Sequence, residues 1–484
     1  MDLKRAGGGA SGSAAGFRAD APTALPRYAF VTGQLASGGL TMTLGDLSER
    51  FAWSVETLRI KVAALMTTDY LKSTLKPPPC DAVYLPGLSQ ADTASLERTF
   101  GIPFRKGPAD LRDLPAFFGE EAQAYRADGE HDLTILAEIN DVYRLDDDAI
   151  LTAAERYRAA GADVIDLGGS PEHPMRDLGR LVGLLKRRGF RVSVDTFDER
   201  EAVSADAAGA EFLLSLNGDN LDLAGRLQHA VPVVIPDHGQ GLSSLLRNVA
   251  EARARGAARL IVDPVLDPIH SGFAASIRRA CETREALPEA EMMMGVGNLT
   301  ELTEADSTGV TAVLAGLMSE LEVRFALTTE VIPWARGAVR ELDCGRRMMH
   351  YAKKRGLAPK GFDARLVTTR DPRPTRPSEE DLRAMQARVT DRNFRIDTDG
   401  ESVYVFNCER FVKGNDIRAL FPKLGVSDDA SHAFYLGREL MKADLARRLG
   451  KKYIQGEPLQ WGYLTYQEEA GGHASRRPAG KGRR

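Results

Sequence analysis

Eight apolar runs between Asp132 and Gly356 constrain the fold of this 484-residue chain more than any other feature. Each run has the length of a buried β-strand and precedes a stretch with helical periodicity, and successive runs lie about 20 to 35 residues apart. The runs are TILAEIN, DVIDLGG, RVSVDT, EFLLSLN, VPVVIPD, RLIVDP, EMMMGVGN and RFALTTE. Eight consecutive strand–helix units close into a barrel. We therefore expect an α/β protein with a central (β/α)₈ TIM barrel over residues 129–357.

Polar residues end every one of these runs. In a barrel the carboxyl ends of all strands meet on one rim, where enzymes of this fold place their chemistry. Asp166 or Asp237 taken alone can be explained as a helix cap, but a whole ring of such residues is harder to explain in that way. The ring comprises Glu138, Asn140, Asp166, Asp195, Asn217, Asp237, Asp263, Asn298 and Glu330. The sequence thus predicts a ligand site on this rim.

The ring contains almost no lysine or arginine, which favours a ligand that donates hydrogen bonds over an anion. A pterin is such a ligand, because its pyrimidine edge presents an amide N–H and an exocyclic amine side by side. One carboxylate can accept from both at once, and a neighbouring Asn can serve the adjacent carbonyl and ring nitrogen. A pterin is therefore a ligand that suits this ring.

Two smaller domains are expected to flank the barrel. Residues 25–128 contain the strand-like runs YAFVTG and DAVYLPG and predict an α/β domain. Residues 382–468 predict an α+β domain, with a hairpin around Asp399-Gly400 and a helix in SHAFYLGRELMKADLARRLG. The Pro-rich, charged stretch 368–381 fits a linker. Residues 1–24 and the basic tail 469–484 are too poor in apolar residues to fold and are expected to be disordered.

The composition and charge of the chain limit the classes of partner to be expected. The net charge of −4 gives no electrostatic reason to expect nucleic acid or an anionic membrane. No apolar run reaches membrane-spanning length, and the start of the chain lacks the apolar core of a signal peptide. The four cysteines never fall at CxxC spacing, so reduced thiols in the cytoplasm are expected. A homodimer is the default assembly for such barrels.

Several strand motifs, in order, resemble those of dihydropteroate synthases and of the wider pterin-binding barrel superfamily. GADVIDLGGSPEHP resembles the second-strand motif of the synthases, SVDT the third, the Asn of SLNGDN that of the fourth, and VDP the sixth. The similarity covers residues 132–356, about half of the chain. Four matches in order on consecutive parts of one barrel are a specific signal.

The resemblance implies a transferase in which an arylamine displaces diphosphate from a hydroxymethyl dihydropterin. Asp195, Asn217 and Asp263 would bind the pterin, with Asn298 beside them, and Asp195 and Asp263 would stabilise the positive charge that develops on the reacting carbon. A magnesium ion held by Asn140 and Asp141 would neutralise the diphosphate. The products would belong to folate or tetrahydromethanopterin biosynthesis.

The chain departs from the synthases in the basic groups that hold the diphosphate. Thr-Arg, Ser-Arg-Lys and Arg-Val-His of the synthases are replaced by Ser170-Pro171-Glu172-His173, Gly297-Asn298-Leu299-Thr300 and Thr328-Thr329-Glu330. Ser170, His173 and Arg336 are the nearby candidates for binding phosphate or the acceptor. The three-part organisation resembles the synthase-related proteins of organisms that make tetrahydromethanopterin, whose arylamine is a ribofuranosyl aminobenzene phosphate.

Three alternatives stay open at the level of the sequence. ILAEIN and GVGNLTELTEAD resemble the methyltransferases of the same superfamily, which suggests a pterin-dependent methyltransferase with a corrinoid partner, since the chain has no DxHxxG cobalamin motif. The missing basic anchors suggest a non-catalytic pterin-binding protein. A barrel with an unrelated sugar or amino acid ligand is the third alternative.

Overall fold

The computed structural model describes residues 25–120, 125–169, 173, 177–361, 363–372 and 375–465. The chain divides into two compact units. Unit 1 is the chain up to Ala124 together with Arg355–Leu357, and unit 2 holds the rest. The expected disordered ends, residues 1–24 and 469–484, lie outside the described residues, as does part of the expected linker.

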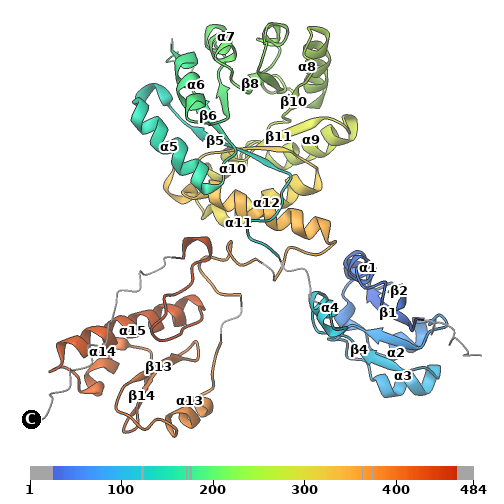
Figure 1. The fold of residues 1–484 in the computed structure, drawn as a ribbon, viewed down its shortest axis with the longest axis vertical. Helices are drawn as coiled ribbons and strands as arrows, with labels where there is room; N and C mark the ends of the chain where they lie inside the picture. Colours follow the sequence, from blue (N-terminus) through green and yellow to red (C-terminus); the bar gives the residue numbers. More distant parts are fainter. Residues whose placement is uncertain are drawn as a thin grey trace, which may run out of the picture. The chain divides into compact units, whose positions relative to one another are not determined.

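Unit 2 contains the expected barrel, so the fold prediction is confirmed (Figure 1). Eight parallel strands close in the order β10-β11-β12-β5-β6-β7-β8-β9. All eight correspond to the apolar runs: β5 Thr134–Ile139, β6 Val164–Gly168, β7 Val192–Asp195, β8 Phe212–Leu216, β9 Val231–Val234, β10 Ile261–Val262, β11 Glu291–Gly295 and β12 Phe325–Thr328. The carboxyl ends of the strands therefore form one rim, as the argument from sequence requires.

Helices follow seven of the eight strands within the described part of the barrel. They are α5 Asp147–Ala160, α6 Leu178–Arg187, α7 Glu199–Ala207, α8 Leu242–Ala254, α9 Phe273–Ala286, α10 Gly297–Thr300 with α11 Ser307–Glu320, and α12 Ala338–Lys354. The expectation of a helix after every strand is wrong at β8, where only the 3₁₀ turn η5 Leu221–Gly225 occurs. The connection from Leu216 to Val231 is short and contains Gly218 and Gly225, which leaves no room for a crossover helix.

Apolar side chains fill the interior of the barrel below the rim. Leu136, Phe212, Val233, Met293 and Phe325 belong to one buried cluster between the strands, and the rings of Phe212 and Phe325 meet edge to face with centroids 5.4 Å apart. A larger cluster lies between the strands and the surrounding helices. The barrel is a packed core and not a pore, so any ligand is confined to the mouth.

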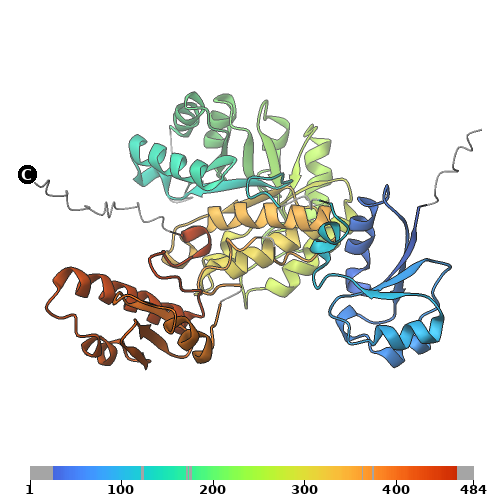
Figure 2. The same cartoon turned by 60° about the horizontal axis from the view of Figure 1, so that its bottom comes forward.

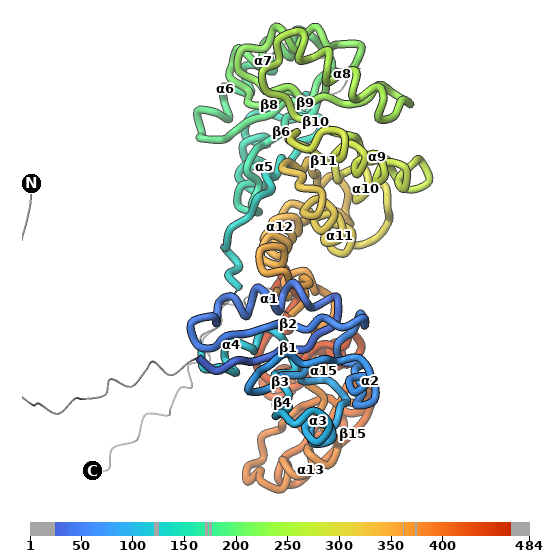
Figure 3. The backbone as a smooth tube through the Cα atoms, turned by 90° about the vertical axis from the view of Figure 1, so that its right-hand side faces the viewer, coloured from blue at the N-terminus to red at the C-terminus, as the bar shows by residue number. Residues whose placement is uncertain are grey.

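Unit 1 is an α/β sandwich (Figure 3). Its four parallel strands, in the order β2-β1-β3-β4, are β1 Arg27–Gly33, β2 Ala52–Leu58, β3 Ala82–Leu85 and β4 Phe104–Lys106. Helices α1 Ser37–Gly45 and α4 Leu114–Phe117 pack on one face of the sheet, and α2 Thr68–Thr74 and α3 Thr93–Phe100 pack on the other. The two expected strands are β1 and β3.

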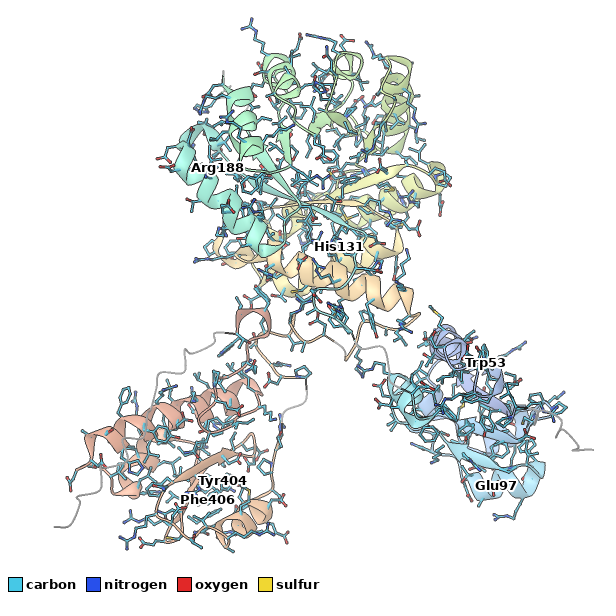
Figure 4. The ribbon with its side chains drawn as sticks, in the orientation of Figure 1. Trp53, Glu97, His131, Arg188, Tyr404 and Phe406 are labelled. Atoms are coloured by element: carbon cyan, nitrogen blue, oxygen red, sulfur yellow. The ribbon has the colours of Figure 1, made fainter. Side chains whose placement is uncertain are left out.

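The C-terminal part of unit 2 is a three-stranded antiparallel sheet covered by helices (Figure 2). β13 Arg395–Thr398 and β14 Val403–Phe406 form the expected hairpin, and β15 Phe411–Gly414 adds a third strand. Helix α15 Ala430–Leu449 packs on β13 and β14, and α13 Glu379–Gln386 and the short α14 Ile417–Leu420 complete this part. Tyr404 and Phe406, labelled in Figure 4, are fully buried. Among the described helices, none is both long and apolar enough to cross a membrane.

Candidate functional site

Four carboxyl groups from four strands come together at the mouth of the barrel. Asp195 ends β7, Asp166 lies in β6, Glu138 lies in β5, and Asp263 directly follows β10. The charge of Asp195 raises the pKa of each of the other three, which places Asp195 near all of them. We call Glu138, Asp166, Asp195 and Asp263 the carboxyl cluster.

Burial changes the protonation of the whole carboxyl cluster. It raises the pKa of Asp195 to about 6, and burial with the neighbouring charge of Asp195 raises that of Asp166 to about 7. Burial likewise raises the pKa of Asp263 to about 7, and that of Glu138 reaches about 9 through burial and the charges of Asp166 and Asp195. At neutral pH Glu138 is therefore a hydrogen-bond donor, whereas Asp195 is largely an ionised acceptor.

This cluster predicts a falling stability from acidic to neutral pH. A carboxyl with a raised pKa binds its proton more tightly in the folded state, so its stabilising contribution is full below about pH 4 and is lost as the pH rises through about 7. Asp166→Asn removes one such proton site. We expect urea unfolding at pH 5 and pH 8 to differ less in the variant than in the wild type, by on the order of 1 kcal/mol or more. An unchanged difference would show that Asp166 ionises normally.

Asp166 is not the helix cap that its sequence position allowed. Its residue is fully buried inside β6, and its Oδ1 accepts a 2.6 Å hydrogen bond from the Ser193 hydroxyl on β7. Its Oδ2 has no hydrogen-bond partner among the described residues. An unpartnered buried oxygen is costly unless it is protonated or meets a ligand, so Asp166 belongs to the candidate site.

A chain of hydrogen bonds joins the first and last strands of the barrel. The Asn140 amide donates to Glu138 Oε1 at 2.8 Å, and the Thr329 hydroxyl donates to Asn140 Oδ1 at 2.7 Å. Thr329 also touches Glu301, whose pKa is raised by burial. These bonds hold the Glu138 carboxyl against Gly168 of β6, where an added Cβ would lie only 2.2 Å from Glu138 Oε1.

Gly168 and Gly169 form a matched pair for testing the position of Glu138. Gly168→Ala forces the Glu138 carboxyl to move and breaks its bond to Asn140, so we expect a loss of about 1–3 kcal/mol in the free energy of unfolding. Gly169→Ala adds a Cβ whose nearest neighbour is the Asp195 carbonyl at 3.5 Å, an ordinary contact. Chemical denaturation should show little change for Gly169→Ala. Equal effects of the two substitutions would contradict this placement of Glu138.

The loop after Asp263 is held by Arg279 of α9. The Val265 N–H donates to Asp263 Oδ1 at 2.7 Å, and Val265 adopts a left-handed conformation with φ 62°, which is strained for a β-branched residue. Arg279 donates to the Val265 carbonyl at 2.6 Å and to Asp267 at 2.9 Å. Burial raises the pKa of Asp263, and the charge of Arg279 offsets part of that rise. The pattern of strand ends missed Arg279 because it comes from a helix.

Asn217 and Asn298, the two amides expected to bind the pterin, differ in whether their amide nitrogens already donate hydrogen bonds. Asn217 is half-buried at the end of β8, and its Oδ1 accepts a 3.0 Å hydrogen bond from the Asp219 N–H. Asn298 lies in α10, and its amide donates to the Leu266 carbonyl at 2.9 Å. Asn298 thus secures the loop that follows Asp263, whereas no described residue accepts a hydrogen bond from the amide nitrogen of Asn217.

Two members of the predicted ring are engaged in ion pairs. Asp237 pairs with Arg247 and accepts from the Asn248 amide at 2.8 Å, and these contacts with the Gly218 N–H hold the pKa of Asp237 below its usual range. Glu330 pairs with Arg156 of α5 and accepts from the Val339 N–H at 3.2 Å. Both carboxylates therefore serve the packing of the rim.

The candidate residues for binding phosphate and metal do not form a cluster like the carboxyl cluster. His173 stacks on Tyr143 with ring centroids 4.6 Å apart, Arg336 is exposed, and Ser170 lies outside the described residues. Asp141 faces Arg144 at 3.4 Å, and the Asn140 oxygen already accepts the Thr329 hydroxyl. Over the described ranges, no three His, Cys, Asp or Glu side chains form a metal site. Magnesium binding by Asn140 and Asp141 stays a prediction, and no step below depends on it.

Comparisons with known proteins cover both units of the chain. Residues 27–109 match a family described as a family of unknown function, DUF6513. The uncharacterized protein MJ0107 of Methanocaldococcus jannaschii is 30% identical over 341 residues, which are 62% of this chain and 64% of that protein. The match therefore spans less than two thirds of the relative's length.

Two solved dihydropteroate synthases and a third solved protein are similar in structure at low identity. The enzyme of Thermus thermophilus is 21% identical over 47% of this chain and 94% of its own, with a TM-score of 0.36. The synthase of Xanthomonas albilineans in complex with 7,8-dihydropteroate is 18% identical over 47% and 94%, with a TM-score of 0.35. Rv1207 of Mycobacterium tuberculosis is 21% identical over 48% and 96%, also at 0.35.

Proposed function

We propose that the chain is a transferase of the dihydropteroate synthase type, which joins a hydroxymethyl dihydropterin diphosphate to an arylamine. The observation that carries this proposal is the buried carboxyl cluster, in which Asp195 stands close to Glu138, Asp166 and Asp263 at the mouth of a closed barrel. Such a cluster suits a flat ligand that both donates and accepts hydrogen bonds in a dry site.

Each group has a separate task in the proposal. Ionised Asp195 accepts from the amide N–H and the exocyclic amine of the pterin, and the Asn217 amide donates to the adjacent acceptors. Glu138, which keeps its proton at neutral pH, is a further donor toward the ring. Asp263 stabilises the positive charge that develops on the reacting carbon as diphosphate leaves, because a carboxylate acts strongly where water is excluded.

The identity of the arylamine acceptor is proposed from the residues that replace the synthases' basic groups at the rim. The loops that carry basic residues in the synthases hold no arginine or lysine at Gly297–Thr300 or at Thr328–Glu330. A larger arylamine such as a ribofuranosyl aminobenzene phosphate would need contacts of its own, for which His173 and Arg336 are candidates. Tetrahydromethanopterin biosynthesis is accordingly the proposed setting, with folate biosynthesis as the other.

Release of pyrophosphate tests the transferase proposal. The purified full chain receives hydroxymethyl dihydropterin diphosphate with magnesium and either 4-aminobenzoate or the ribofuranosyl aminobenzene phosphate, beside a known synthase as positive control. We expect pyrophosphate release with at least one arylamine and none when the arylamine is omitted. If neither arylamine supports release while the control enzyme works, the transferase proposal fails even if the pterin binds.

The hydrogen bond between Asn140 and Glu138 favours a second candidate, a pterin-dependent methyltransferase. This Glu-and-Asn pair on the first strand is the feature that resembles the methyltransferases, and the 2.8 Å bond holds the two side chains together. In that reaction a protonated carboxyl beside the ring would supply the proton that activates a methylated pterin. Transfer of a labelled methyl group from a methylated reduced pterin to an added corrinoid protein would favour this candidate over the synthase.

A further inference from the structure

The sheet of unit 1 has a topological switch point with a cavity at it. The chain runs from β1 to β2 on one side and then to β3 on the other, in the strand order β2-β1-β3-β4. In open parallel sheets, ligands bind beyond the carboxyl ends of the strands where the order reverses. A cavity of about 210 Å³ lies at this place, lined by Thr32 at the end of β1 and by Pro86, Gly87 and Leu88 after β3.

The floor of the cavity is aromatic and aliphatic. The rings of Phe30 and Tyr84, which pair in register on β1 and β3, stack with centroids 5.2 Å apart and planes at 15°. Leu40 of α1 and Leu111 and Leu114 close the sides. All these leucines and rings belong to the core between the sheet and helices α1 and α4. The cavity therefore opens out of a packed core.

The lining contains no charged side chain. Its polar side chains are Tyr84 and Thr32. Thr32 is 3% exposed, and among the described residues its hydroxyl makes one long hydrogen bond of 3.5 Å, to the Gly33 carbonyl. A bond of that length leaves the hydroxyl poorly satisfied. A ligand in this cavity would therefore be uncharged and would meet at most one or two polar groups.

Gly33 and Gly87 lie at the mouth of the cavity, where backbone atoms of neighbouring loops pack closely and leave no room for a Cβ. A Cβ at Gly87 would lie 2.5 Å from the Gly107 carbonyl, and one at Gly33 would lie 2.6 Å from the Ile60 carbonyl. Side chains at these two positions would push the loops apart. Leu88, which lines the cavity, is 62% exposed, and Leu35 and Leu65, next to the lining residues Ala36 and Ala64, are 73% and 61% exposed.

We propose that unit 1 binds an uncharged aromatic molecule of one or two fused rings in this cavity, between the loops that follow β1 and β3. The volume supports this size, because an apolar cavity of about 150 Å³ is known to bind benzene. Stacked rings on the floor and leucines at the sides match a flat apolar molecule. The exposed Leu88 at the opening would cover part of the ligand that faces solvent. This proposal is independent of the pterin site in unit 2.

Indole is a suitable probe for the full-length chain, with indole-5-carboxylate as the charged counterpart. Calorimetry and ligand-observed NMR should show saturable binding of indole and binding at least tenfold weaker for the carboxylate. Ala64→Phe, which fills the cavity from its wall, should weaken indole binding at least tenfold, and Ala36→Leu should do the same from another side. Ala52→Phe, at the amino end of β2 and outside the lining, is the matched control and should leave binding unchanged.

The outcomes separate this site from the barrel site. Asp195→Asn should leave indole binding as it is, whereas the two filling substitutions should leave pterin binding as it is. Indole binding that survives both Ala64→Phe and Ala36→Leu in folded protein would overturn the proposal. Absence of indole binding would also overturn it, and a dimer that dissociates on Leu88→Ser would then identify the rim as a contact with a second copy of the chain.

Discussion

Asp195→Asn is expected to lower the affinity for a reduced pterin by about 100-fold. The substitution keeps the size of the side chain but replaces a charged acceptor with a neutral amide, one half of which is a donor that would face the donors of the pterin edge. Two charge-assisted hydrogen bonds contribute about 1.5–3 kcal/mol each, and loss of about 2.7 kcal/mol corresponds to that factor. Calorimetric titration with hydroxymethyl dihydropterin measures this loss of affinity.

Asp219→Asn provides the matched control for this result. Asp219 follows Asn217 in the loop after β8 and is exposed, so the same chemical change there should alter pterin affinity less than about threefold. Melting temperatures of both variants should confirm that each is folded. Equal affinity of Asp195→Asn and the wild type would mean that the pterin edge does not rest on Asp195.

Arg346→Met is expected to destabilise the barrel by about 3–5 kcal/mol. The Arg346 side chain of α12 is only 2% exposed and pairs with Asp163 and Asp343, the latter at 2.8 Å. It also donates to the carbonyls of Leu133 at 2.6 Å and Gly161 at 2.9 Å, and so ties the last helix to the amino ends of the first two strands. Removal of one partner leaves Asp343 as a buried charge with less compensation, which accounts for the size of the effect.

Arg191→Met tests whether burial causes that effect. Arg191 pairs with Glu211 at 2.6 Å, but its side chain is 47% exposed. A surface pair of this kind contributes about 0–1 kcal/mol, so urea denaturation should show a small change. A loss for Arg346→Met as small as that for Arg191→Met would contradict the role given to the buried network.

The strands of the barrel were predictable because each depends on local sequence. An apolar run such as RVSVDT carries its own signal, and a polar residue at its end marks the rim whatever the rest of the chain does. The missing helix after β8 was less visible, since LDLAGRL has a helical pattern although the connection around it is too short. Strands β2 and β4 of unit 1 had no comparable apolar run.

The chemistry of the site depended on contacts between distant residues. Asp237 and Asp263 look alike in sequence, yet Arg247 and Asn248 hold one in the packing of the rim while burial raises the pKa of the other. The sequence position of Asp166 allows a helix cap, and its unpartnered oxygen becomes visible only in the folded barrel. Residue type and strand position therefore located the rim, whereas protonation required the three-dimensional neighbours.

A crystal structure of the chain with hydroxymethyl dihydropterin tests the pterin site most directly. The pyrimidine edge of the ligand should lie within hydrogen-bond distance of the Asp195 carboxylate, with the Asn217 amide and Asp263 on the same ring. A pterin bound elsewhere on the chain, or a barrel mouth without ligand at saturating pterin, would contradict the assignment.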